Sequence, residues 1–214
     1  MGTIKKGILG SFSGKVGNVV GASWRNIAYM RSLPSSMRNP RTEKQVTQRN
    51  RFSLIGKFLK CIIPVIRVGF KHVAGTSNSA FSAAMSYNIR NGVKGEYPDF
   101  EIDFQQVAIA MGGLYPAANV TAACEAGKLK FTWDAALRNN TSTEDRVMAV
   151  AYNPTTEEAV YDLNVATRAA GNGLLEVPPT WDGATVETFV AFASEDGAQV
   201  SDTVYTGQVE IIPE

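Results

Sequence analysis

The chain has 214 residues, of which 44% are hydrophobic, so it can build one or two domains with packed cores and is not disordered as a whole. Its formal net charge of +1 conceals a strong asymmetry. Residues 1–94 carry sixteen Lys and Arg against one acid, Glu43, whereas residues 95–214 carry five basic residues against nineteen acids. Charge alone therefore predicts a boundary near Gly95, between a basic segment, residues 1–94, and an acidic domain, residues 95–214.

Cysteine content and hydropathy argue against a disulfide-stabilised scaffold, a secreted protein with a signal peptide and a membrane-spanning protein. Cys61 and Cys124 lie far apart in the sequence and do not form a disulfide framework. The stretch after Lys5 and Lys6 lacks the apolar run of a signal peptide, and no window of about 18 uncharged apolar residues predicts a transmembrane helix. We therefore expect synthesis in the cytoplasm and no membrane insertion.

The glycine-rich stretch GSFSGKVGNVVGASW, which starts at Gly10, does not match a phosphate-binding P-loop. That motif needs a glycine five places before its Gly-Lys pair and a hydroxyl directly after the pair. Here Leu9 and Val16 occupy those two positions around Gly14 and Lys15. We therefore expect no nucleotide at this stretch.

Period-two alternation instead predicts a strand over residues 16–24 and a second strand over residues 27–32, joined by a turn at Arg25 and Asn26. One face of the first strand is almost bare of side chains. Such a face requires the close approach of another backbone, either from a partner chain or from the protein's own helices. The residues of this bare face are Gly17, Val19, Gly21 and Ser23.

Two helices are expected after this hairpin. The first begins near Thr42, which can form a capping box with Gln45, and Pro64 must break or kink it. The second runs from Ser79 to Ile89 and ends at Asn91 and Gly92. The apolar residues that recur at helical spacing in the two helices are Phe52, Ile55, Leu59, Ile62, Ile63, Ile66, Phe81, Ala84, Met85 and Ile89.

The acidic domain changes to a period of two residues. The stretch DFEIDF, residues 99–104, alternates acids with apolar residues and predicts a half-buried strand. Turn signals separate further short strands, and such spacing is typical of an immunoglobulin or fibronectin-like sandwich with a buried Trp133. The predicted fold class is therefore α+β, a β-hairpin plus helices followed by an all-β sandwich. The further strand candidates are QVAIAM, NVTAACE, KLKFTWDA, RVMAVAYN, EAVYDLN, LLEVP, VETFVAFAS and VYTGQVEII.

The sequence contains no convincing catalytic or metal-binding pattern. His72 is the only histidine, and its neighbours in the sequence supply no acid, so it is expected at a helix C-terminus. The acids of residues 96–103 alternate with apolar residues, which indicates a solvated strand face rather than a calcium loop. We expect no enzyme activity, no cofactor and no metal ion.

Three motifs carry a resemblance to a known family: GILGSFSGKVGNVVGASWRNIAYMRS, NPRTEKQVTQRNRF and DGAQVSDTVYTGQVEI. Together they span nearly the whole chain, which resembles an uncharacterised family of Bacteroidetes and of the phages that infect them. The resemblance implies no catalytic residue. It implies a role in a virion, in the head or the tail, or in its assembly.

The basic segment is the most informative feature for function. A charge of this size repels itself unless a counter-charge lies close, and the acidic domain of the same or another copy supplies one. We therefore expect a non-enzymatic structural protein that binds other protein subunits through aromatic anchors and arginine clamps. The candidate partner-binding residues are Gly17, Gly21, Trp24, Tyr29, Arg31, Arg38, Arg41, Arg49 and Arg51.

Two alternatives remain open at this point. The same arginines can neutralise the phosphates of a nucleic acid, as in a packaging protein. A sandwich with exposed aromatic residues such as Tyr152, Tyr161 and Trp181 is instead typical of a carbohydrate-binding or adhesion module.

Overall fold

The computed structural model divides the chain into two compact units, Met1–Thr42 (unit 1) and Glu43–Glu214 (unit 2). This division differs from the boundary expected near Gly95. The basic helices that follow Thr42 share one hydrophobic core with strands of the acidic segment. Charge therefore marks a change of composition within unit 2. The described residues are 2–4, 10–24, 27–36, 39, 41–75 and 78–212.

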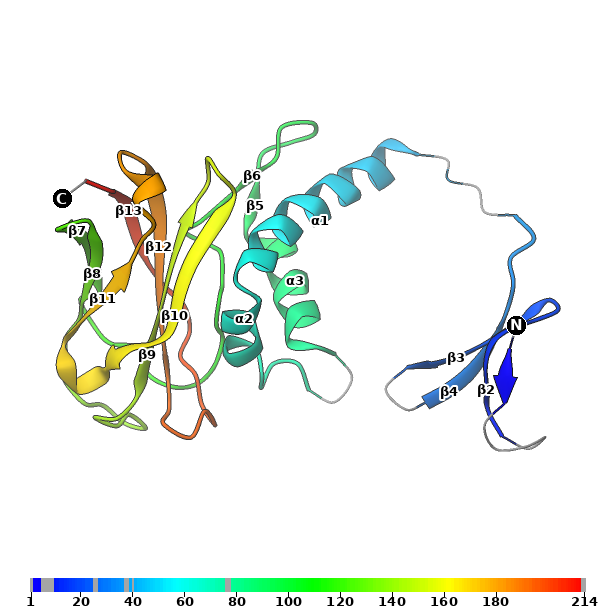
Figure 1. The fold of residues 1–214 in the computed structure, drawn as a ribbon, viewed down its shortest axis with the longest axis horizontal. Coiled ribbons are helices and arrows are strands. Elements are labelled where there is room, and N and C mark those ends of the chain that lie inside the picture. The colour runs from blue at the N-terminus through cyan, green and yellow to red at the C-terminus, as the bar shows by residue number, and fades with distance from the viewer. Residues whose placement is uncertain are drawn as a thin grey trace. The chain divides into compact units, whose positions relative to one another are not determined.

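Unit 1 is built on an antiparallel sheet with the strand order β1-β2-β3-β4 (Figure 1). The edge strand β4 confirms the strand predicted over residues 27–32, whereas the turn predicted at Arg25 and Asn26 lies outside the described residues. The strands are β1 (Thr3–Ile4), β2 (Phe12–Val16), β3 (Val19–Trp24) and β4 (Ile27–Ser32).

The single strand predicted over residues 16–24 is wrong, because the chain reverses inside it. Val16 pairs with Val19 across a two-residue turn made by Gly17 and Asn18. Gly17 has a φ of +57°. A glycine at the first central position of a hairpin turn accepts this backbone conformation without strain.

The described part of unit 2 begins with the α-helices α1 (Glu43–Cys61), α2 (Ile63–Gly69) and α3 (Ala80–Asn91). Pro64 sits in the first turn of α2, where its missing N–H costs least, and so confirms the predicted break. Ser79 caps α3, because its hydroxyl accepts a hydrogen bond of 3.0 Å from the backbone N–H of Ser82. Gly92 ends that helix, as predicted.

Within the described residues of unit 2, the strands form antiparallel sheets with the orders β10-β9-β12-β13, β11-β8-β7 and β5-β6. The mixture of helices and antiparallel sheets confirms the α+β class. The short 3-10 helices η1 (Arg168–Ala170) and η2 (Pro179–Trp181) flank β11. The strands are β5 (Val93–Lys94), β6 (Glu101–Ile102), β7 (Thr121–Glu125), β8 (Lys128–Thr132), β9 (Arg146–Asn153), β10 (Glu158–Thr167), β11 (Asn172–Glu176), β12 (Thr185–Ala193) and β13 (Val204–Glu210).

Strand β9 lies in the middle of a three-layered arrangement, which explains its continuous apolar sequence. Val147, Ala149 and Ala151 point into a core shared with the β11-β8-β7 sheet. The alternate residues Met148 and Val150 point into a second core, shared with the helices. Figure 1 shows the helices beside one face of the β10-β9-β12-β13 sheet and the β11-β8-β7 sheet beside the other face. A strand buried on both faces cannot show an alternating polar pattern.

The stretch QVAIAM, residues 106–111, is not a strand, although Val107 to Ala110 are buried. Side chains bind its backbone instead of a neighbouring strand. Asn88 donates 2.9 Å to the carbonyl of Ala108 and accepts 2.8 Å from its N–H. The Thr203 hydroxyl accepts from Ile109 and Ala110, at 2.9 Å each. These side chains satisfy backbone groups that a sheet would otherwise pair.

The strand predicted over residues 99–104 shortens to the two-residue β6. Its partner β5 is equally short, so the ladder holds only two residue pairs. The chain then turns, because Gln106 and Val107 both donate to the carbonyl of Asp103. The alternation that predicted a longer strand reflects half-burial of its apolar residues without a longer partner strand.

Candidate functional site

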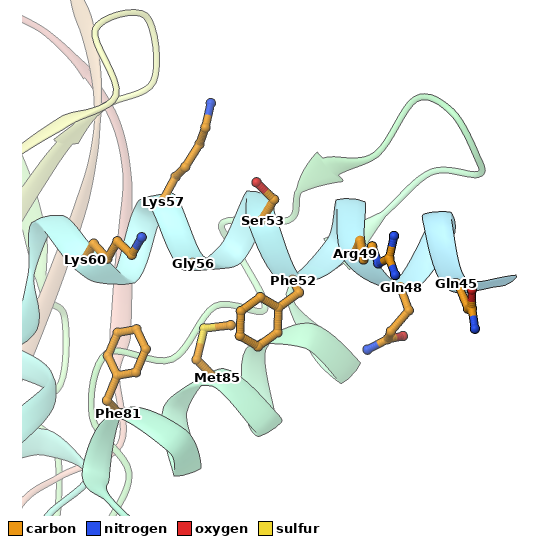
Figure 2. A pocket seen from close by; sticks show the side chains of 10 residues that line it. All are labelled: Gln45, Gln48, Arg49, Phe52, Ser53, Gly56, Lys57, Lys60, Phe81 and Met85. Atoms are coloured by element: carbon orange, nitrogen blue, oxygen red, sulfur yellow. The ribbon is translucent and has the colours of Figure 1, made fainter. Parts of the chain in front are cut away.

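A groove lies between α1 and α3 of unit 2 (Figure 2). Its first section has a volume of about 600 Å³, and an adjoining section of about 450 Å³ shares Gln48, Phe52, Phe81 and Met85 with it. We call this feature the α1–α3 groove. Its lining residues are Gln45, Gln48, Arg49, Phe52, Ser53, Gly56, Lys57, Lys60, Phe81, Ser82, Met85, Ser86, Ile89 and Arg90.

The floor of the α1–α3 groove is apolar. Figure 2 shows Phe52 of α1 directed toward Met85 of α3, with Phe81 farther along the same helix. Phe52 leaves 56% of its surface exposed, although the residues around it belong to a packed pair of helices. A large aromatic side chain exposed in a concave surface is typical of a binding site.

Gly56 lies in the middle of this floor and adds no side chain to it. A Cβ placed on Gly56 would meet one atom within 4 Å, the Cε of Met85 at 3.9 Å, which is an ordinary contact. An alanine would therefore fit the chain itself. Glycine inside a helix costs about 1 kcal/mol relative to alanine. The packing of unit 2 does not require the glycine, and its effect is to leave room in the groove.

The rim of the α1–α3 groove is basic. Four cations, Arg49, Lys57, Lys60 and Arg90, stand along it, and none of the described residues that line it is acidic. Lys57 pairs at 2.8 Å with Glu157, outside the groove. The groove therefore presents a positive border around an apolar floor.

The C-terminal end of α1 contains a thiol with no catalytic activation. The Sγ of Cys61 donates to the carbonyls of Lys57 and Glu157, at 3.3 and 3.2 Å. Burial raises the pKa of Cys61, and the carboxylates of Glu157 and Glu158 add to this effect. A thiol with a raised pKa stays protonated at neutral pH and is a poor nucleophile. The neighbouring Tyr152 is also desolvated, which raises its pKa to about 12.

Unit 1 brings together three of the predicted partner-binding residues. The register pairs Trp24 with Ile27 and Ala22 with Tyr29, and it aligns Arg31 with Val20 and Lys15. Because side chains alternate along each strand, all of these lie on one face of the sheet, which we call the aromatic face. Trp24, Ile27 and Tyr29 are exposed on it.

The two glycines of the prediction have structural roles inside unit 1. Gly17 forms the β2–β3 turn. Gly21 is buried beneath Phe12 of β2: a Cβ there would run into the backbone carbonyl oxygen of Phe12 and lie 2.7 Å from the Cδ2 of its ring. The bare face around Gly21 is thus covered at this point by the backbone and side chain of a residue in the neighbouring strand of the same sheet.

The arginines of the prediction are divided between the two units. Arg31 and Arg41 are exposed in unit 1, and Arg38 lies outside the described residues. Arg49 lines the α1–α3 groove. Arg51 points elsewhere, because its guanidinium lies 4.8 Å from the ring centre of Phe100.

Sequence reasoning missed the groove because it assigned Phe81, Met85 and Ile89 to the core. Met85 is buried, yet all three also line the groove. The sequence of α1 did contain an indication of the groove. Phe52, Gly56 and other groove residues recur about every four residues, on a face of the helix offset from the face that packs into the core.

In the part of the chain that the structure describes, no three His, Cys, Asp or Glu side chains lie close enough together to hold a metal ion. Among the same residues, no helix is both long and apolar enough to cross a membrane. His72 is exposed in the turn after α2.

The fold and its surfaces define an α+β protein, mostly of antiparallel strands, that exposes an aromatic sheet face and a basic-rimmed apolar groove. The sequence model of a protein family described as a family of unknown function (DUF6266) matches residues 11–207. The chain belongs to this family. No curated protein matches the chain.

Proposed function

We propose that the protein is a non-enzymatic structural protein that docks onto neighbouring protein subunits through the aromatic face of unit 1. The observation that carries this proposal is the exposure of Trp24, Ile27 and Tyr29, which is 54%, 63% and 46%. Three large apolar side chains on one sheet face form the kind of patch that marks a protein interface. Arg31 and Lys15 on the same face supply charged contacts beside the aromatic anchors.

The edge of the same sheet supports docking to protein. Every residue of β4 is exposed, and β4 is the last strand in the sheet order. An exposed apolar edge strand offers unpaired backbone groups that another chain can pair with. Burial of such an edge and face by a neighbouring subunit would also stabilise a sheet that has little core of its own.

The concrete form of the proposal is a component of a bacteriophage particle, in its head or tail. The resemblance of three motifs to a family found in phages supports this form. Unit 2 would then present an immunoglobulin-like sandwich within the particle. The two sheets that share a core around Phe131 and Val190, with Trp133 buried beside them, support the sandwich interpretation.

The test is incorporation into purified particles. We expect mass spectrometry to find the wild-type chain in phage particles purified from the source culture, and to find much less of the double variant Trp24→Ser/Tyr29→Ser. Leu174→Ser is the matched control, since Leu174 is also an exposed apolar strand residue but belongs to unit 2. Absence of the wild-type chain from particles, or equal incorporation of the double variant, would contradict the proposal.

The nucleic-acid alternative is weaker because the predicted arginines are not uniformly available. Arg51 lies against Phe100, so one of the arginines expected to contact phosphates already packs on a ring of the protein itself. A mobility-shift assay at low and high salt separates the two functions, since phosphate contacts weaken steeply with salt. We expect no shift of a DNA or RNA duplex at low salt.

The carbohydrate-binding alternative depended on exposed aromatic residues. Tyr152 and Trp181 are buried, and Tyr161 is half-buried against the helix-side core. These three residues therefore do not form an exposed stacking platform for a sugar ring.

A further inference from the structure

The α1–α3 groove is a second candidate binding surface, independent of the aromatic face. Its floor combines exposed Phe52 with Phe81, Met85 and Ile89, and Gly56 leaves a depression between them. A glycine that the helix does not need for its own packing is expected where another chain approaches closely. The groove is therefore shaped to receive apolar side chains.

The backbone around the groove restricts the form of this ligand. Residues of α1 and α3 line both sides, and helices use their backbone hydrogen bonds internally. The groove consequently offers side-chain contacts and no free strand edge. A ligand that enters it must satisfy its own backbone groups, which an amphipathic helix does.

The charge of the rim restricts the ligand further. Cations from both helices border the floor, and no acid is among the described lining residues. A helix with acidic residues on either side of an apolar stripe would complement this border, whereas a basic helix would be repelled.

The chain's own helices do not meet this description. Glu43 is the only acid in α1, α2 and α3 taken together, and residues 1–42 contain no acid. The other nineteen acids of the protein lie in its β-rich part, after residue 94. Charge thus points to a helix from a different protein rather than to a second copy of this chain.

We propose that the α1–α3 groove binds an acidic amphipathic helix of a partner protein. Apolar side chains of that helix fill the space above Gly56 and contact Phe52 and Phe81. Its acidic flanks face Lys60 on α1 and Arg90 on α3.

The test is a selection from a displayed library of peptides of about 16 residues, which as helices span about 24 Å. The full-length protein is the bait, and the variant Gly56→Leu is used for counter-selection because a leucine there fills the groove. We expect the enriched peptides to share an apolar stripe at helical spacing with Glu and Asp beside it. Enrichment of basic or extended sequences overturns the proposal. The proposal is also overturned if no enriched peptide binds the wild-type protein more tightly than it binds Gly56→Leu.

Affinities of one enriched peptide then test each part of the site. We expect Gly56→Leu to weaken binding by about tenfold or more, and Lys60→Glu to weaken it by about fivefold. Arg67→Glu is the matched control, because Arg67 is an exposed cation on α2 that does not line the groove, and its affinity should equal that of the wild type. Equal effects of Lys60→Glu and Arg67→Glu would show unspecific attraction and overturn the proposal.

Two further measurements keep the test decisive. Circular dichroism checks that Gly56→Leu is folded, and Phe81→Ser replaces it if it is not, with the same expected loss of binding. A DNA duplex that binds the full-length protein, and loses binding with Lys60→Glu but not with Arg67→Glu, would assign the rim to nucleic acid and overturn the proposal. Failure of particle incorporation in the aromatic-face variants leaves this result unaffected, since those residues belong to unit 1.

Discussion

Arg168 carries a large share of the polar organisation inside unit 2. It is fully buried, and its Nε donates to the Oδ2 of Asp145 at 2.9 Å. Its Nη2 donates to the carbonyl of Tyr115 at 2.7 Å, and its guanidinium lies 4.3 Å from the ring centre of Phe192. The carbonyl of Arg168 also accepts from the indole of Trp133 at 2.8 Å. The side chain of Arg168 thus joins η1 to Asp145, Tyr115 and β12, and its backbone carbonyl adds the residue after β8.

Removing this cation should destabilise the protein strongly. In Arg168→Met the carboxylate of Asp145 stays buried without its partner, which costs about 3–5 kcal/mol of the free energy of unfolding. Urea denaturation followed by circular dichroism measures the loss. The double variant Asp145→Ala/Arg168→Met should lose less than Arg168→Met alone, because the uncompensated charge is gone. Additive losses from the two substitutions would contradict this reading of the pair.

Two glycines on neighbouring helices allow a matched comparison at the scale of the element. A Cβ on Gly56 of α1 would make only one ordinary contact, with the Cε of Met85 at 3.9 Å, whereas a Cβ on Gly69 of α2 would lie 2.3 Å from the carbonyl oxygen of Ile109 and 2.7 Å from the Cα of Ala110. Gly69 is therefore required by the close approach of the segment after β6, and Gly56 is not required by any contact of this kind.

The two substitutions should consequently change stability in opposite directions. Gly56→Ala should raise the free energy of unfolding by about 0.5–1 kcal/mol, since alanine favours the helix and meets only Met85. Gly69→Ala should lower it by about 1–3 kcal/mol, because the backbone of Ile109 and Ala110 must shift. Urea midpoints of the two variants measure both effects. A destabilised Gly56→Ala would mean that the groove floor is packed more tightly than described.

Elements were predictable from the sequence where local pattern and tertiary environment agree. Strand β9 and helix α3 follow their apolar runs closely, because both are bounded by clear turn or cap signals such as Ser79 and Gly92. The non-strand conformation of residues 106–111 was not predictable from the sequence. Backbone groups of this stretch form hydrogen bonds with the side chains of Asn88 and Thr203, which are distant from it in the sequence. Hydrophobic periodicity indicates which residues are buried, and residues 107–110 are buried without forming a strand.

The candidate sites were predictable only in part, for a similar reason. Trp24, Tyr29 and Arg31 were identified as partner-binding candidates, and the strand register places them on one face. The α1–α3 groove depends on how two helices separated by α2 and a turn pack together, which residue spacing within one helix does not report. Apolar residues such as Met85 serve the core and the groove at once, so their hydrophobicity does not distinguish the two roles.

At the scale of the whole molecule, packing and charge divide the chain at different places. Both hydrophobic cores consist of residues that follow Thr42, and they include the basic helices together with acidic strands. Among the described residues of unit 1, only Gly21 is buried. The stability of the protein should therefore reside in unit 2, while unit 1 depends on what covers its exposed sheet.

Separate production of the two units tests this division. A fragment of residues 43–214 should unfold cooperatively with a Tm within about 3 °C of the full-length chain, because it retains both cores. A fragment of residues 1–42 should show no cooperative transition, since a sheet whose apolar residues stay exposed gains too little free energy to offset the loss of chain entropy. Calorimetry of both fragments beside the intact protein measures this. If residues 43–214 melted far below the intact chain, unit 1 would have to contribute packing that the two cores of unit 2 do not contain.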